Sequence, residues 1–529
     1  MDKRLLLLLL IVILVAGCTG NNGQIEEANE ADIAAEATSD AEFQERLAKI
    51  PPTPTKTLIP TYTPRPAEGL DATPIPGQRV DPIPVLPLGT AATSPGPWMV
   101  VQGVDSFYMV SEDGSEVWRL PLLHDSLVLP GKWSVPDQGG FIAIAHDMMV
   151  DKYLEVRSWP ENEVILDLDL LGYTGAPLTF ETDFEAEQFE LDRHYATGEM
   201  AWSGSGELLA FIGSQEGPTP DLYTFDPANG DVAQLTSGPK HAIMPSWSPD
   251  DEFIFHAGVE SLGIGSSGAG NIGWSFYVAR WDGSEVLWVG DGKSENKMDE
   301  YLAGWVSAES VLMYSGYWWC GLTDLRKVNI RTGEQTSIWS GQFDAIGYSY
   351  PERQALLWVW DQSEETEECG PVQEPGFHLI DIQAQTSEKL EIQTTFDFFE
   401  DIAWEDRISS FIGWKGAAYQ AIPPSPQLDA WPNPPAFTQN GEWVAFAWGL
   451  PPKSLVVEKP GADEPLIDTG EILPINLSWT PDGNRLYYFL KGKQGTHDLW
   501  VVSLEDLEPM LVVEGLMIEE QSQPQWVIP

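Results

Sequence analysis

The feature that most constrains the fold of this chain is an internal repeat. The clearest copies are Trp247-Ser248-Pro249-Asp250 and Trp479-Thr480-Pro481-Asp482, each followed by an apolar stretch. Each copy predicts a strand, a tight turn and a second strand, because proline presets the first turn dihedral and aspartate hydrogen-bonds to the backbone beyond it. Such a unit must stack its apolar face on a neighbouring unit, so the repeats predict an array of similar sheets.

Weaker copies appear when the aromatic residue that ends the first strand is used as an anchor. The seven internal anchors are Trp133, Trp202, Trp247, Trp305, Tyr348, Phe437 and Trp479. Most neighbouring anchors lie 42 to 58 residues apart, close to the roughly 40–50 residues of one four-stranded propeller blade. Short strands separated by Gly, Pro, Asn and Asp favour antiparallel sheets. The predicted fold class is therefore all-β, a β-propeller.

The two ends of the repeat region predict how the ring closes. Residues 526–528 read as a first strand with no blade after it, whereas residues 98–120 hold three strands with no first strand before them. Joined, they make one composite blade, which brings the expected count to eight, with seven as the alternative. Residues 400–430, around Trp404, are interpreted as an incomplete blade or an insertion, and residues 171–197 as a second insertion.

The repeats resemble the WD40-like (PD40) repeats of TolB-type β-propellers, whose blades carry a Trp-Ser-Pro-Asp-Gly signature. The resemblance covers residues 97–529 and is strongest at Trp247 and Trp479. It implies the fold and leaves the activity open. TolB-type propellers include docking platforms for proteins, substrate-gating domains of prolyl-oligopeptidase-like enzymes, and surface modules of unknown ligand.

The N-terminal region predicts export and a lipid anchor. A basic start, an apolar run of eleven residues from Leu5 to Val15, and the ending Ala16-Gly17-Cys18 follow one another. The run is too short to span a bilayer, and residues 1–18 resemble a bacterial lipoprotein signal peptide in which Cys18 becomes the acylated first residue. An ordinary signal peptide is the alternative. The expected location is extracytoplasmic, on the cell membrane or on an outer membrane where the cell has one.

Residues 19–96 predict a disordered tether between this anchor and the propeller. Their first part is small, polar and acidic, and from Pro51 onward the segment is rich in Pro and Thr. Such a composition favours extended polyproline segments and cannot build a core.

The charge balance limits the partners. The chain has 81 acidic and 28 basic residues and a formal net charge of −53. A surface of this sign repels DNA, RNA and anionic lipid headgroups, so nucleic acid is excluded. The expected partners are an envelope protein, a peptide or a glycan. The sequence has no His-Glu-x-x-His pair and no Asp-x-Asp-x-Asp-Gly loop, so we expect no metal and no cofactor.

The cysteines and their neighbours supply the candidate site residues. With Cys18 assigned to lipid, Cys320 and Cys369 form an even pair, each between the second and third strands of consecutive blades. In an exported protein this placement predicts a disulfide, with two separate thiols as the alternative. Trp318 and Trp319 directly precede Cys320, and they are the candidate aromatic rim of a ligand site.

Signals of catalysis are weak, because no Gly-x-Ser-x-Gly nucleophile elbow occurs. The expected function is a non-catalytic protein- or ligand-binding module of the cell envelope. Two alternatives stay open: a hydrolase or lyase that uses carboxylates in the propeller channel, and a sensor or assembly component that works with a separate partner.

Overall fold

The computed structural model divides the chain into two units, Met1–Pro74 and Ile75–Pro529, and all the residues it describes belong to the second unit. The described residues are 85–86, 94, 96–123, 128, 132–136, 138, 140–147, 151–175, 180, 182–262, 273–292, 299–317, 321–343, 345–349, 353–359, 371, 373–389, 411–414, 417–422, 436–438, 443–448, 454–458, 466–468, 474–493, 495–519 and 522–528.

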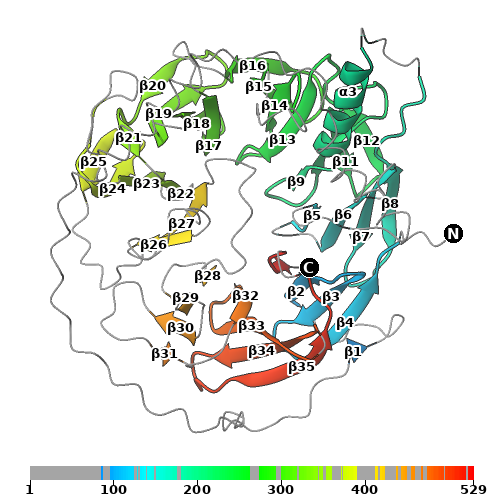
Figure 1. Ribbon diagram of the computed structural model, residues 1–529, viewed down its shortest axis with the longest axis vertical. Coiled ribbons are helices and arrows are strands. Elements are labelled where there is room, and N and C mark those ends of the chain that lie inside the picture. The colour runs from blue at the N-terminus through cyan, green and yellow to red at the C-terminus, as the bar shows by residue number, and fades with distance from the viewer. Residues whose placement is uncertain are drawn as a thin grey trace, which may run out of the picture. The chain divides into compact units, whose positions relative to one another are not determined.

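The described strands form eight sheets, numbered here in chain order (Figure 1). Sheet 1 contains β1 (Val85–Leu86), β2 (Trp98–Gln102), β3 (Ser106–Ser111), β4 (Val117–Pro121) and β36 (Gln525–Val527). Sheet 2 contains β5 (Trp133–Ser134), β6 (Phe141–Asp147), β7 (Lys152–Ser158) and β8 (Val164–Asp169). Sheet 3 contains β9 (Met200–Trp202), β10 (Leu209–Gly213), β11 (Asp221–Asp226) and β12 (Asp231–Gln234). Sheet 4 contains β13 (His241–Trp247), β14 (Phe253–Val259), β15 (Ser275–Arg280) and β16 (Val286–Asp291).

The other four sheets continue the series. Sheet 5 contains β17 (Asp299–Ser307), β18 (Ser310–Tyr317), β19 (Gly321–Asn329), β20 (Gln335–Ser337) and β21 (Gln342–Phe343). Sheet 6 contains β22 (Ala345–Ser349), β23 (Gln354–Val359), β24 (Gly376–Asp381), β25 (Thr386–Lys389), β26 (Phe411–Trp414) and β27 (Ala417–Ile422). Sheet 7 contains β28 (Ala436–Phe437), β29 (Val444–Trp448), β30 (Ser454–Glu458) and β31 (Ile467–Asp468). Sheet 8 contains β32 (Pro474–Trp479), β33 (Arg485–Lys491), β34 (His497–Ser503) and β35 (Met510–Leu516).

The seven aromatic anchors all lie on the first strand of a sheet, as the repeat predicts. Trp133 is on β5, Trp247 on β13 and Trp479 on β32, and each precedes the turn into the second strand. Within the sheets most strands pair antiparallel with their neighbours in the chain. The prediction of an all-β propeller is therefore confirmed.

The composite blade is also confirmed, because β36 pairs with β2 in sheet 1. Their register places Val527 opposite Trp98 and Trp526 opposite Met99. Val527 and Trp98 are fully buried. A strand not predicted from the sequence, β1, adds to the other edge of this sheet, where it runs parallel to β4.

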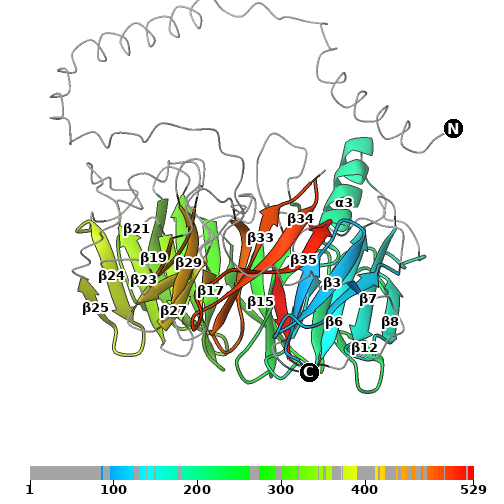
Figure 2. The ribbon, with the colours of Figure 1, turned by 90° about the horizontal axis from the view of Figure 1, so that it is seen from below.

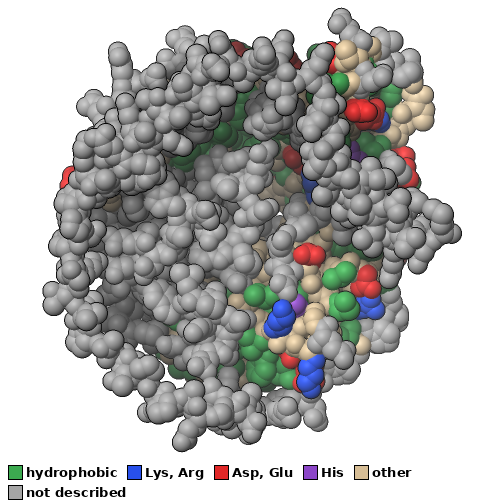
Figure 3. Space-filling view, viewed as in Figure 1, with side chains coloured by type: hydrophobic (Ala, Val, Ile, Leu, Met, Phe, Trp, Pro, Cys, Tyr) green, Lys and Arg blue, Asp and Glu red, His purple; other side chains and the backbone are tan. Residues whose placement is uncertain are grey.

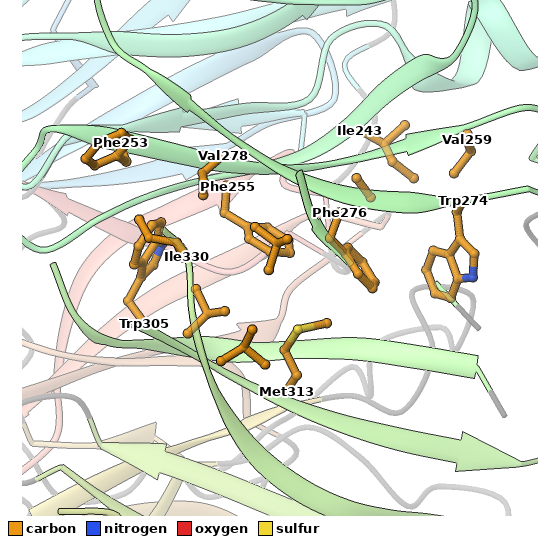
Figure 4. Close-up of a cluster of buried hydrophobic side chains, with 14 of the residues drawn as sticks. Ile243, Phe253, Phe255, Val259, Trp274, Phe276, Val278, Trp305, Met313 and Ile330 are labelled. Atoms are coloured by element: carbon orange, nitrogen blue, oxygen red, sulfur yellow. The ribbon is translucent and has the colours of Figure 1, made fainter. Parts of the chain in front are cut away.

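Buried apolar side chains hold neighbouring sheets together. Between sheets 4 and 5 the rings of Phe255 and Phe276 stack at 5.4 Å, and Val311 and Met313 of β18 belong to the same cluster (Figure 4). Similar clusters join sheets 1 and 2, 2 and 3, 3 and 4, 5 and 6, 7 and 8, and 8 and 1. Each large side chain fully buried in this way contributes roughly 1.5–3 kcal/mol. The ring is held together blade by blade.

The blade count stays a prediction, because residues 390–410 and 423–435 lie outside the described ranges. What the structure describes of residues 400–430 is the hairpin β26–β27, whose strand β27 pairs with β22, the first strand of sheet 6. This agrees with the expected insertion.

The expected insertion at residues 171–197 contains a helix, α3 (Asp183–Ala196), which follows β8 and precedes β9. The sequence predicted an insertion here, and the helix is a finding of the structure. Figure 2 shows α3 rising above the edge of the sheets.

Candidate docking surface

The residues singled out in the sequence lie outside the described part of the chain, namely Cys18, Trp318, Trp319, Cys320 and Cys369. The strands that flank them are described. Residues 318–320 connect β18 to β19, and Cys369 lies between β23 and β24. Both cysteines therefore fall between the second and third strands of consecutive sheets, while the lipid, the disulfide and the aromatic rim stay predictions.

The polar side chains of the repeat signature form hydrogen bonds within the turn to which they belong. Ser248 Oγ accepts a hydrogen bond from the backbone N–H of Phe253 at 2.9 Å and donates to Asp250 Oδ1 at 2.7 Å. Thr480 occupies the same position in sheet 8, where its hydroxyl donates to Asp482 Oδ1 at 2.6 Å. Hydroxyl and carboxylate side chains often satisfy turn backbone in this way. The signature therefore builds the fold and is not a ligand site.

The anchor tryptophans are also used by the fold, because each ties its sheet to the preceding one. The indole Nε1 of Trp247 donates to the carbonyl oxygen of Ala201 at 2.9 Å, and that of Trp305 donates to Ser246 O at 3.2 Å. In sheet 8, Trp479 Nε1 donates to Ala436 O at 2.9 Å. A buried indole needs such an acceptor.

A buried carboxylate in sheet 2 is satisfied by two cationic or potentially cationic groups. Glu155 Oε2 lies 2.6 Å from His146 Nε2, and Glu155 Oε1 accepts from Arg157 Nε. Burial favours the neutral acid, but the hydrogen bond from His146 and the charge of Arg157 outweigh it, so the pKa of Glu155 lies below its usual value. Glu155 and His146 are fully buried. They form a buried, hydrogen-bonded pair that solvent does not reach.

Sheet 5 contains a second buried ion pair. Glu300 on β17 pairs with Arg326 on β19, and Ser315 Oγ on β18 donates to Glu300 Oε1 at 3.1 Å. Arg326 Nη1 in turn donates to Ser315 Oγ at 3.0 Å. Burial lowers the pKa of Arg326 to about 10, which keeps the guanidinium charged at neutral pH.

One exposed apolar surface lies on α3, whose two ends are firmly capped. At the N-terminus a capping box is present: the N–H of Glu185 donates to Thr182 Oγ1 at 3.2 Å, and the N–H of Thr182 donates to Glu185 Oε2 at 3.2 Å. At the C-terminus Lys152 Nζ, on β7 of sheet 2, donates to the carbonyl oxygen of His194 at 2.5 Å. A cation at a helix C-terminus also interacts favourably with the helix dipole.

Side-chain contacts attach α3 to two further sheets. Arg193 Nε donates to Ser214 Oγ, just after β10 of sheet 3, at 3.1 Å, and its Nη2 donates to Leu171 O at 3.1 Å. Phe189 packs on His241, the first residue of β13 in sheet 4, with ring centroids 5.1 Å apart. The helix is therefore fixed to sheets 2, 3 and 4 at once.

The outward face of α3 carries a row of exposed apolar side chains. Phe184 is 62% exposed, Leu191 is 42% exposed and Tyr195 is 49% exposed. Residues seven and eleven positions apart lie on nearly the same side of a helix with 3.6 residues per turn. The three side chains, called here the α3 stripe, therefore form one line, roughly 16 Å long at 1.5 Å per residue.

Exposed acidic side chains accompany the stripe on α3. They are Glu185, Glu187 and Glu190. Glu187 is exposed and lies three residues after Phe184 and four before Leu191, so it stands beside the stripe. In Figure 3 separate acidic side chains are visible on this face of the molecule, among atoms that are not described. The surface combines an apolar ridge with negative charge.

Sequence reasoning missed this surface although a signal was present. Thr182 followed by Glu185 is a capping box, which predicts a helix start. The spacing of Phe184, Leu191 and Tyr195 is a helical period. Both were overlooked because the surrounding repeats favoured strands.

Within the described ranges, no three His, Cys, Asp or Glu side chains gather in a way that suits a metal ion. The same residues contain no helix with the length and apolarity needed to cross a membrane.

Comparisons with solved structures return matches of low identity, among them a prolyl endopeptidase, TolB proteins and a eukaryotic initiation factor. The chain is 12% identical to a prolyl endopeptidase structure, with a TM-score of 0.38, covering 72% of this chain and 49% of that one. It is 11% identical to TolB from Acinetobacter baumannii, with a TM-score of 0.27, covering 73% and 81%. The repeats and their sheets make this chain a β-propeller. The identities and TM-scores are too low to support an inference about function. The chain spans about half the length of the endopeptidase.

A short stretch also matches a curated protein. Over 66 residues the chain is 41% identical to the uncharacterized peptidase YuxL of Bacillus subtilis (strain 168), which covers 12% of this chain and 10% of the relative. No family model matches the chain. A match to a tenth of a relative transfers no activity.

Proposed function

We propose that this protein is a lipid-anchored, extracytoplasmic β-propeller that acts as a non-catalytic protein-binding module of the cell envelope. The observation that carries the proposal is the α3 stripe, Phe184, Leu191 and Tyr195, exposed on a helix that is fixed to three sheets. Three large apolar side chains in line, held open to water, are typical of a helix face that binds another protein.

The shape of this surface favours a protein over a small molecule. Small ligands bind in concave sites that bury most of their surface. The stripe is a ridge on a helix that rises above the sheets (Figure 2), and it offers a line of contacts roughly three helical turns long. A ridge of this length suits an extended partner segment.

The position in the envelope rests on the N-terminal signal, with Cys18 as the acylated residue. We expect the Cys18→Ala variant to lose acylation and to leave the membrane fraction, since the hydrocarbon chains are the proposed anchor. Retention of processed Cys18→Ala protein in the detergent phase would show that the anchor lies elsewhere.

The binding role is tested by photo-cross-linking in native membranes. A photoreactive phenylalanine analogue replaces Leu191 on the stripe or, as the control, Trp288, which is 59% exposed on β16. We expect an adduct with a defined protein from position 191 only. We also expect that adduct to disappear when Phe184 and Tyr195 are changed to serine. Equal adducts from both positions, or no adduct from either, would contradict the proposed function.

A further inference from the structure

We propose that the α3 stripe binds a cationic amphipathic helix of a partner protein, about three turns long, in a salt-dependent manner. This inference rests on the proposed function and adds the chemistry of the partner. It is carried by the juxtaposition on α3 of an apolar ridge, an acidic border and a rigid attachment to the propeller.

The ridge sets the pattern of apolar residues that the partner must present. Phe184, Leu191 and Tyr195 repeat at helical spacing over roughly 16 Å. Helices that bind along such a ridge present apolar anchors at intervals of three, four and seven residues. The partner segment should therefore be helical, with one apolar face of about the same length.

The acidic residues beside the stripe determine the charge that the partner segment must have. Glu187 is exposed beside the stripe and has no ion-pair partner among the described residues. Glu190, also exposed, pairs among the described residues with Arg193 of its own helix, at 3.3 Å. With the exposed glutamates Glu185, Glu187 and Glu190, α3 attracts positive charge, and the net charge of −53 attracts cationic segments to the chain as a whole.

The same charges decide against an anionic bilayer as the occupant of the stripe. A helix that lies on a membrane has Lys and Arg on its polar face, which bind anionic headgroups. On α3 the exposed charged residues next to the stripe are glutamates. An anionic lipid surface would be repelled, whereas a cationic protein helix would be attracted.

The rigid attachment lowers the cost of binding. The capping box at Thr182, the contact of Lys152 with the C-terminal carbonyl groups and the contacts of Arg193 with sheet 3 hold α3 in place before any partner arrives. A preformed surface loses little conformational freedom on association.

The test measures binding of a labelled synthetic helix to the purified full chain by fluorescence anisotropy. The probe is a Leu/Lys amphipathic helix of about 18 residues, since isolated helices shorter than about 12–15 residues are marginal in water. A Leu/Glu helix with the same apolar face and a scrambled Leu/Lys peptide with the same charge are the control probes. Vesicles of anionic lipid test the membrane as an occupant.

Two matched variants separate the stripe from general charge attraction. F184S/L191S/Y195S removes the stripe and keeps the carboxylates, while V232S/V286S/W288S removes three exposed apolar side chains from the outer strands β12 and β16. We expect the stripe variant to weaken binding of the Leu/Lys helix at least about tenfold and the control variant to change it less than about twofold. E187Q/E190Q should weaken binding at about 0.1 M salt and have little effect at about 1 M, where the screening length falls to about 3 Å.

Equal loss in the two triple variants, equal binding of the scrambled peptide, or binding of the Leu/Glu helix or the anionic vesicles would overturn the inference. If the cross-linker at position 191 still captures a defined partner in any of these cases, the proposed function stands and only the cationic class is wrong. If the cross-linker captures nothing, the proposed function itself fails.

Discussion

The indole Nε1 of Trp247 donates a hydrogen bond to the backbone carbonyl oxygen of Ala201 at 2.9 Å, and so ties sheet 4 to sheet 3. Trp305 repeats the contact between sheets 5 and 4, with Ser246 O as its acceptor. The aromatic residue that marks the repeat is therefore also the group that joins successive blades. At these two positions the tryptophan has both a packing role and a hydrogen-bonding role.

Replacing Trp247 by phenylalanine should destabilise the propeller by about 1–2 kcal/mol. The change keeps an aromatic ring in the core but removes the donor and leaves the Ala201 carbonyl without its indole partner. Urea unfolding checks the prediction. The matched control is Trp288→Phe, at an exposed indole on β16, which should change stability by less than about 0.5 kcal/mol. Equal effects of the two substitutions would show that the contact with Ala201 contributes nothing.

Deleting residues 523–529 should lower stability by several kcal/mol. The deletion removes β36, exposes the face of Trp98 that packs with Val527, and leaves the β2 edge unpaired. Thermal unfolding measures the loss. A shorter deletion of residues 528–529, which keeps β36, should leave the melting temperature nearly unchanged. An unaltered melting temperature for the longer deletion would count against ring closure through sheet 1.

Acidification should destabilise the propeller through His256. This side chain is buried, its ring stacks on Tyr277 at 5.5 Å, and its Nδ1 atom has no hydrogen-bond partner among the described residues. Burial lowers its pKa to about 4 from 6.5. The unfolded chain therefore binds a proton more readily, so stability should fall as the pH drops from about 6.5 to about 4, by on the order of 3 kcal/mol.

The contribution of His256 is isolated by the variant His256→Gln, which cannot take up a proton in this range. Unfolding free energies measured at several pH values should give a shallower slope between pH 6.5 and 4 for the variant than for the wild-type chain. Parallel slopes would show that another group causes the acid sensitivity; His241, with a pKa of about 4, is the next candidate.

Asp221 should have the opposite effect on the pH dependence of stability. Burial raises its pKa to about 7 from 3.8, although hydrogen bonds from Thr236 and Gln234 oppose the shift. The folded chain thus holds a proton that the unfolded chain loses, so this stabilisation is complete below about pH 4 and disappears as the pH rises through about 7. Asp221→Asn should remove that part of the pH dependence in unfolding measurements. A variant that keeps the wild-type profile would show that Asp221 is ionised in the folded protein.

We also propose the Cys320–Cys369 disulfide as a prediction that can be checked directly. Both residues lie between the second and third strands of consecutive sheets, and closing a loop of about 50 residues should stabilise the fold by roughly 3–4 kcal/mol. Peptide mapping without reduction should recover one bridged pair from exported protein. Alkylation of both cysteines under native, non-reducing conditions would contradict the bridge.

The sequence was most informative where the repeat signature is complete. The signature at Trp247 and Trp479 predicted the first strand, its turn and the second strand, because the serine or threonine hydroxyl and the aspartate carboxylate satisfy the turn locally. Ring closure through residues 524–528 was predictable for the same reason, as a first strand without its blade stood opposite a blade without its first strand.

The surface on α3 was not predicted, because it depends on contacts between distant segments. Whether Phe184 is exposed is decided by where Lys152, Ser214 and His241 hold the helix, and these residues belong to three different sheets. Strand β1 was missed for a similar reason. Its two residues carry no periodic pattern, and their partner is the remote strand β4.

The pairing of β36 with β2 has a consequence for synthesis of the chain. Sheet 1 lacks its edge strand β36 until Gln525–Val527 have been synthesised. Its strands β2, β3 and β4 are synthesised much earlier, at the start of the propeller. A chain released too early therefore presents an unpaired strand and an open apolar face, the features that chaperones and proteases recognise. Pairing of β36 with β2 therefore protects this edge and this apolar face from such recognition.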